Sequence, residues 1–129
     1  MRWLLAMIAM LTAQPGLACG LEPGFRLELE DGLSLDYRVE PAPLEVGRHF
    51  AMRFQFCRDG AEVALDGFRL DAVMPAHGHG MNYRAGVSEI RVGVYLVEGM
   101  LFHMPGSWQV VIDFEQAGQR RRALVDIKL

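Results

Sequence analysis

Beyond its N-terminal segment, this chain alternates apolar and polar side chains with a period of two. Phe25, Leu27 and Leu29 alternate with charged residues, and residues 50–57 and 108–114 repeat the pattern. Successive side chains of a β-strand point to opposite faces, so each run predicts a half-buried strand. The helical period of 3.6 residues is nearly absent from this part of the sequence. The alternation therefore predicts an all-β fold.

Turn-forming residues separate these runs. Asp31-Gly32, Asp59-Gly60 and Ala117-Gly118 are typical of tight turns, and Pro41-Ala42-Pro43 interrupts regular strand pairing. About seven or eight short strands with no helix between them favour an antiparallel β-sandwich of the immunoglobulin-like type. A small β-barrel is the alternative architecture.

The first 18 residues have the order of a secretory signal peptide. Arg2 precedes an apolar run over residues 3–11, and a Gln-Pro-Gly break and small residues lead to Ala18. The run is shorter than the roughly 20 residues that a membrane-spanning helix needs. We therefore expect cleavage after Ala18 and a soluble, periplasmic or otherwise exported domain at residues 19–129, without a transmembrane segment.

Two cysteines follow the predicted cleavage point, Cys19 and Cys57. Export places them in an oxidising compartment, which favours a disulfide between them. Lipid attachment to Cys19 is the alternative, but Gly16 stands where a lipoprotein signal usually has an aliphatic residue.

Composition argues against two classes of function. The net charge is −3, and the one basic cluster, residues 120–122, sits at a predicted hairpin turn, so we expect no nucleic-acid partner. No arrangement of nucleophile, base and carboxylate is evident, so the sequence does not predict an enzyme.

Histidine and methionine gather in two segments, MPAHGHGM at residues 74–81 and HMPG at residues 103–106. Imidazole and thioether groups together are the ligand set suited to copper. Gly78 and Gly80 relax the backbone around the first pair of histidines. We expect His49 to lie at the surface. The predicted metal ligands are His77, His79, Met81, His103 and Met104, with Met74 as a further candidate.

The two segments can share an ion only if the topology brings them to the same end of the sandwich. If one strand within residues 82–93 runs back along the sandwich, both segments lie at the same end. If this stretch contains no such strand, they lie at opposite ends. The sequence offers two candidates for this strand, residues 81–84 and residues 88–91.

Two other interpretations use the same residues. Zinc bound by His77, His79 and His103 with a water ligand would form the site of a hydrolase, but the adjacent methionines would then be unexplained. Alternatively, the segments form a metal-free protein-interaction surface in the periplasm, where methionine supplies adaptable apolar contacts.

The segments MPAHGHGMNYR (residues 74–84) and GMLFHMPGSW (residues 99–108) resemble the YtkA-like family, relatives of exported FixH-type proteins. The resemblance covers about residues 50–129 and implies an immunoglobulin-like β-sandwich outside the cytoplasmic membrane. It also implies a role in copper handling or respiratory oxidase assembly, with a periplasmic or membrane-bound copper or respiratory protein as partner. The chain departs from the family at Ala85, where members often have proline, and we expect no FixH-type membrane anchor. The His and Met positions of the family fall on Met74, His77, His79, Met81, His103 and Met104.

Overall fold

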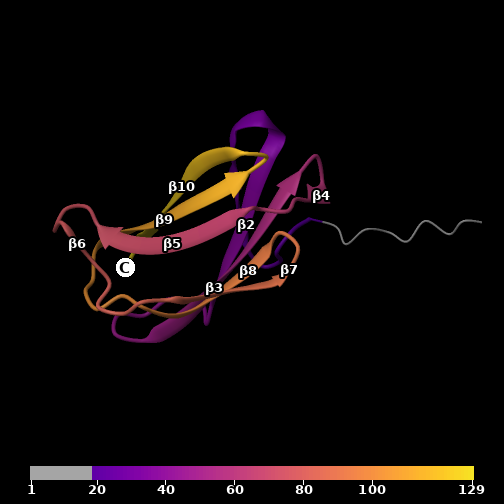
Figure 1. Ribbon diagram of the computed structural model, residues 1–129. Helices are drawn as coiled ribbons and strands as arrows, with labels where there is room; N and C mark the ends of the chain where they lie inside the picture. Colours follow the sequence, from indigo (N-terminus) through magenta and orange to yellow (C-terminus); the bar gives the residue numbers. More distant parts are fainter. Residues whose placement is uncertain (1–18) are drawn as a thin grey trace, which may run out of the picture.

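A computed structural model describes residues 19–129, and the predicted signal peptide at residues 1–18 lies outside the described residues. Two antiparallel sheets pack face to face as a sandwich (Figure 1). The first sheet has the order β1 (Phe25–Glu28), β2 (Leu33–Glu40), β3 (His49–Arg58), β8 (Val94–Leu101) and β7 (Gly86–Arg91), with β4 (Ala61–Glu62) also paired to β3. The second has the order β10 (Gln119–Lys128), β9 (Ser107–Gln116), β5 (Gly67–Met74) and β6 (His79–Gly80).

The predicted antiparallel β-sandwich is confirmed. Eight strands have four or more residues, as the alternation indicated, and β4 and β6 add two residues each. The described residues contain one 3-10 turn, η1 (Glu30–Gly32), and no α-helix. No helix in this part of the chain is long and apolar enough to cross a membrane.

The core lies between the two sheets and follows the alternation of the sequence. On β9, every second residue is buried, beginning with Trp108 and ending with Gln116. On β3, Met52, Phe54 and Phe56 are fully buried and face the second sheet as part of the same cluster. Full burial of one such apolar side chain stabilises the fold by about 1.5–3 kcal/mol.

Tyr95 on β8 is a titratable group within this core. Its ring stacks on Phe68 with centroids 4.3 Å apart. Burial, with a smaller contribution from the neighbouring Glu89 carboxylate, raises the pKa of Tyr95 to about 12. The unfolded phenol ionises near pH 10, so the unfolded chain releases this proton first. We expect the free energy of unfolding to fall between about pH 10 and 12. In Tyr95→Phe this decrease should be smaller. Urea unfolding across this pH range tests the expectation, and identical pH profiles for the two proteins would contradict it.

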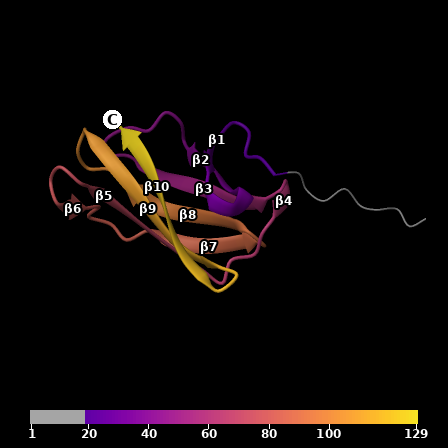
Figure 2. The same ribbon diagram turned by 90° about the horizontal axis from the view of Figure 1, so that it is seen from above.

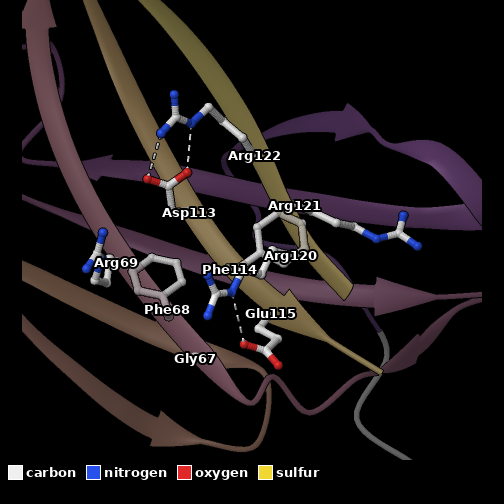
Figure 3. Close-up of a pocket in the computed structure, with 9 residues that line it drawn as sticks. All are labelled: Gly67, Phe68, Arg69, Asp113, Phe114, Glu115, Arg120, Arg121 and Arg122. Atoms are coloured by element: carbon white, nitrogen blue, oxygen red, sulfur yellow. Dashed lines mark hydrogen bonds and ion pairs between the residues drawn. The ribbon is translucent and has the colours of Figure 1, made fainter. Parts of the chain in front are cut away.

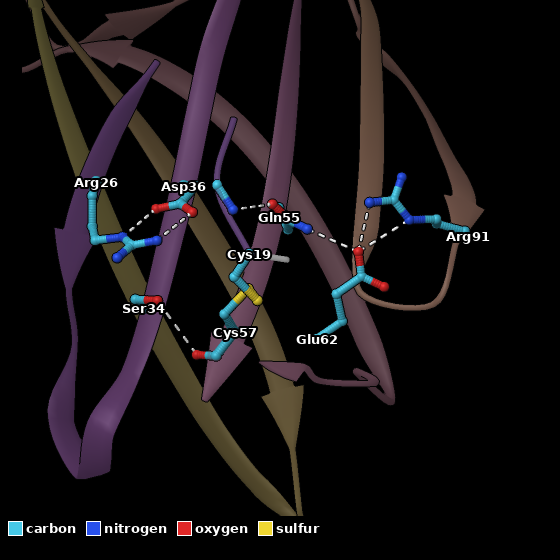
Figure 4. The surroundings of a disulfide bond; sticks show 9 residues. Cys19, Arg26, Ser34, Asp36, Gln55, Cys57, Glu62 and Arg91 are labelled. Atoms are coloured by element: carbon cyan, nitrogen blue, oxygen red, sulfur yellow. Dashed lines mark hydrogen bonds and ion pairs between the residues drawn. A yellow bond between two sulfur atoms is a disulfide. The ribbon is translucent and has the colours of Figure 1, made fainter. Parts of the chain in front are cut away.

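The predicted disulfide is present and joins Cys19 to Cys57 on β3 (Figure 4). The next residue is also fixed, because the Gly20 N–H donates to Gln55 Oε1 at 2.9 Å. The bond uses the Cys19 sulfur, so a thioether lipid cannot occupy that atom at the same time. The disulfide indicates an oxidising, exported environment.

The disulfide should contribute strongly to stability because it joins residues 38 positions apart. Closing a loop of this length lowers the entropy of the unfolded chain. This raises the free energy of unfolding by about 3–4 kcal/mol. We expect the double variant Cys19→Ser/Cys57→Ser to lose about this much free energy of unfolding in a urea titration. Reductant should destabilise the parent and leave the double variant unchanged. A loss below about 1 kcal/mol would contradict the expectation.

Candidate metal centre

The fold brings the two His/Met segments to the same end of the sandwich. The chain leaves β5 at Met74, returns along β7, and runs back antiparallel to it along β8 to Leu101. The returning strand is therefore residues 86–91, which includes the second of the two segments that the sequence left open. Figures 1 and 2 both show β6 at the end of the sandwich where β5 finishes and β9 starts.

A tight hairpin positions the first segment. The Met74 carbonyl accepts hydrogen bonds from the N–H groups of His77 and Gly78, both at 3.0 Å. Gly78 has φ of +65°, a conformation that glycine adopts without strain. The chain then reverses, and His79 pairs in register with Met74 as β6 begins. The turn thus returns His79 to the side of β5.

The second segment is held by its neighbours in the second sheet. Gly106 and Leu129 exchange two backbone hydrogen bonds, each of 3.0 Å. The Trp108 indole N–H donates to the Met104 carbonyl at 3.0 Å, and the indole stacks on Phe102 with ring centroids 4.6 Å apart. These contacts fix the loop between β8 and β9 over a buried aromatic pair.

Three imidazoles form a row across the two segments. The ring centroid of His79 lies 5.7 Å from that of His77 and 5.3 Å from that of His103. Two imidazoles that bind one ion at about 2 Å with a tetrahedral angle have centroids about 5 Å apart. The spacing of each pair is therefore compatible with a shared ion, and His79 is the member common to both pairs.

Trp108 forms the inner wall beside this row. Its ring centroid is 6.2 Å from that of His79 and 5.4 Å from that of His103, both in edge-on geometry. The sequence pattern did not predict a place for Trp108 in the site. The one signal for it was a tryptophan two residues after the HMPG segment, at the start of a strongly alternating strand.

His103 carries a buried nitrogen without a partner. Its Nδ1 atom is inaccessible to solvent and has no hydrogen bond within the described residues. Among the described residues, all other buried side-chain nitrogen or oxygen atoms without a hydrogen bond belong to arginines. By contrast, the His79 Nδ1 atom lies 3.2 Å from the Gly80 carbonyl oxygen. Such a contact orients an imidazole and leaves its Nε2 atom for another ligand.

The remaining predicted ligands differ in exposure. His77 is exposed, whereas Met81 and Met104 are half-buried and pack against the core. Met74 is 1% exposed and belongs to the core cluster, so its side chain serves packing. His49 is exposed as expected and its ring lies edge-on to Tyr83, with centroids 5.1 Å apart.

Residues 19–129 contain no group of three His, Cys, Asp or Glu side chains arranged to hold a metal ion. The structure therefore gives no support to a zinc centre built on three imidazoles.

The arginine cluster at residues 120–122 lies at the opposite end of β9 and borders a surface hollow of about 430 Å³ (Figure 3). Arg122 donates two hydrogen bonds to Asp113, at 2.7 and 3.0 Å, and lowers the pKa of that carboxyl. Arg121 pairs with Asp31 at 2.9 Å. These pairings leave the cluster largely neutralised, as expected for a solvated strand end.

Comparisons with known proteins support the fold. A DUF4426 family protein from Pseudomonas aeruginosa is similar over 85% of this chain and 97% of its own, with 10% identity and a TM-score of 0.60. A DUF4785 family protein from Legionella pneumophila matches 78% of this chain but 29% of its own length, with 12% identity and a TM-score of 0.57. No family model matches the chain, and no curated protein matches it significantly. The resemblance to the YtkA-like family stays a prediction.

Proposed function

We propose that this protein binds copper in the periplasm as a carrier, buffer or accessory of oxidase assembly. The observation that carries the proposal is the unpartnered, buried Nδ1 of His103 beside the imidazole of His79. A buried nitrogen without a partner costs about 1–3 kcal/mol, and such an atom in a folded protein calls for an explanation such as a bound ion. An ion shared with His79 would remove this cost.

The donors in this proposal are His79 and His103 through nitrogen, and Met81 and Met104 through sulfur. Imidazole and thioether together favour copper over the oxygen-seeking divalent ions. His77, exposed beside His79, would be the first ligand that an arriving ion meets and the first that a receiving protein displaces. This arrangement suits transfer of the ion to another protein, and the YtkA-like resemblance agrees with such a role.

Equilibrium dialysis of residues 19–129 with copper, in both oxidation states, tests the proposal. Trp108 is the sole tryptophan of this segment, so quenching of its fluorescence reports binding beside His79 and His103. We expect one ion per chain and a quenched signal. Equal copper retention by the triple variant His77→Ala/His79→Ala/His103→Ala would refute the proposal and favour the metal-free interaction module.

A further inference from the structure

The two segments that hold the histidines carry no charged side chain. Residues 74–83 and 102–108 include no Asp, Glu, Lys or Arg. The nearest acidic residue in sequence, Asp71, accepts a hydrogen bond from the Ala72 N–H at 2.8 Å. Asp71 is exposed, whereas Ala72 and Met74 point into the core, so alternation places the Asp71 carboxylate on the outer face of β5. No carboxylate of these two segments is present to offset the charge of a bound ion.

The inner wall beside the histidines is apolar. Phe102 and Trp108 are at most 1% exposed and stack beneath the row of imidazoles. The cost of moving an ion from water into such surroundings grows with the square of its charge, so a divalent ion costs about four times as much as a monovalent one. Because neither segment supplies a carboxylate or thiolate, this penalty falls more heavily on Cu²⁺ and Zn²⁺ than on a monovalent ion.

The proposed donor atoms also favour a monovalent ion. Neutral imidazole and thioether groups leave the charge of the ion unchanged, and thioether sulfur selects Cu(I). Structural zinc is usually held by four ligands that include thiolates or histidines. Among the described residues, no group of three His, Cys, Asp or Glu side chains is arranged to hold one ion.

We infer that the site takes a soft monovalent cation, Cu(I) or its analogue Ag(I), in preference to Cu²⁺ and Zn²⁺. This inference rests on the proposed copper site and adds the charge of the ion that it accepts. The protein would then handle copper in its reduced state.

Competition titrations of residues 19–129 with Cu(I), Ag(I), Cu²⁺ and Zn²⁺, the first under anaerobic conditions, test the inference. We expect Cu(I) and Ag(I) to bind at least 100-fold more tightly than Zn²⁺. The double variant Met81→Leu/Met104→Leu conserves side-chain volume but removes both sulfurs. It should lose at least 10-fold in Ag(I) affinity and keep its Zn²⁺ affinity. Met52→Leu, a fully buried core residue on β3, is the matched control and should change neither.

The outcomes separate the two proposals. Absence of binding by every ion overturns the proposed function and the inference together. Binding of Zn²⁺ or Cu²⁺ as tightly as Ag(I), or unchanged Ag(I) affinity in the folded double variant, overturns the monovalent preference alone. If that variant fails to unfold cooperatively, the four-ion comparison on the parent chain decides the inference.

Discussion

Replacing His79 with asparagine is expected to lower copper affinity by about 100-fold or more. His79 is the middle imidazole, 5.7 Å from His77 and 5.3 Å from His103 between ring centroids, so its loss breaks both pairs. Removal of groups that only orient metal ligands already costs 10–100-fold in affinity, and removal of a ligand should cost more. Competition titration against a chelator of known affinity measures the change.

Two matched substitutions accompany this prediction. His49→Asn removes an exposed imidazole that contacts Tyr83 and should change copper affinity by less than about twofold. His77→Asn removes an exposed ligand at the rim and should cost less than His79→Asn. Equal effects at His49 and His79 would show that copper binds histidines indiscriminately, contrary to the proposal.

Replacing Trp108 with alanine is expected to lower the free energy of unfolding by about 3–5 kcal/mol. The side chain is 1% exposed, stacks on Phe102, and donates its N–H to the Met104 carbonyl. Alanine leaves a cavity between the sheets and removes that donor. Because the same side chain supports both His/Met segments, we also expect weaker copper binding by the variant.

Urea unfolding with circular dichroism measures the stability change. Leu124→Ala on β10 is the control, because Leu124 is 44% exposed and surface substitutions usually change stability by less than about 0.5 kcal/mol. A loss below about 1 kcal/mol in Trp108→Ala would mean that the indole is not part of a close-packed core.

Most of the fold could be predicted because alternation and burial agree along the long strands. On β9 the buried positions from Trp108 to Phe114 are all apolar. The two-residue strands β4 and β6 could not be predicted, since a pattern of period two needs more residues to be visible. Phe25 illustrates another limit: it lies on β1 as expected but is 62% exposed. Alternation identified this strand but not which of its positions are buried.

The candidate site could be predicted only in part. The His/Met segments were evident from the sequence, but they meet only because one strand returns between them. Tertiary packing determines where that strand forms between β6 and β8. The burial of Met74 had a local signal, because it continues the inward positions of Phe68, Leu70 and Ala72 on β5. For Trp108, the only signal was its position just after the HMPG segment, and its place beside both histidines depends on how the two sheets stack.

The most direct test of the shared site is an NMR titration of the histidine side chains in residues 19–129 with Ag(I), a diamagnetic analogue of Cu(I). We expect the imidazole signals of His79 and His103 to shift together and saturate at one equivalent, while those of His49 stay in place. Unchanged signals from His79 and His103, or equal shifts at all four histidines, would contradict it.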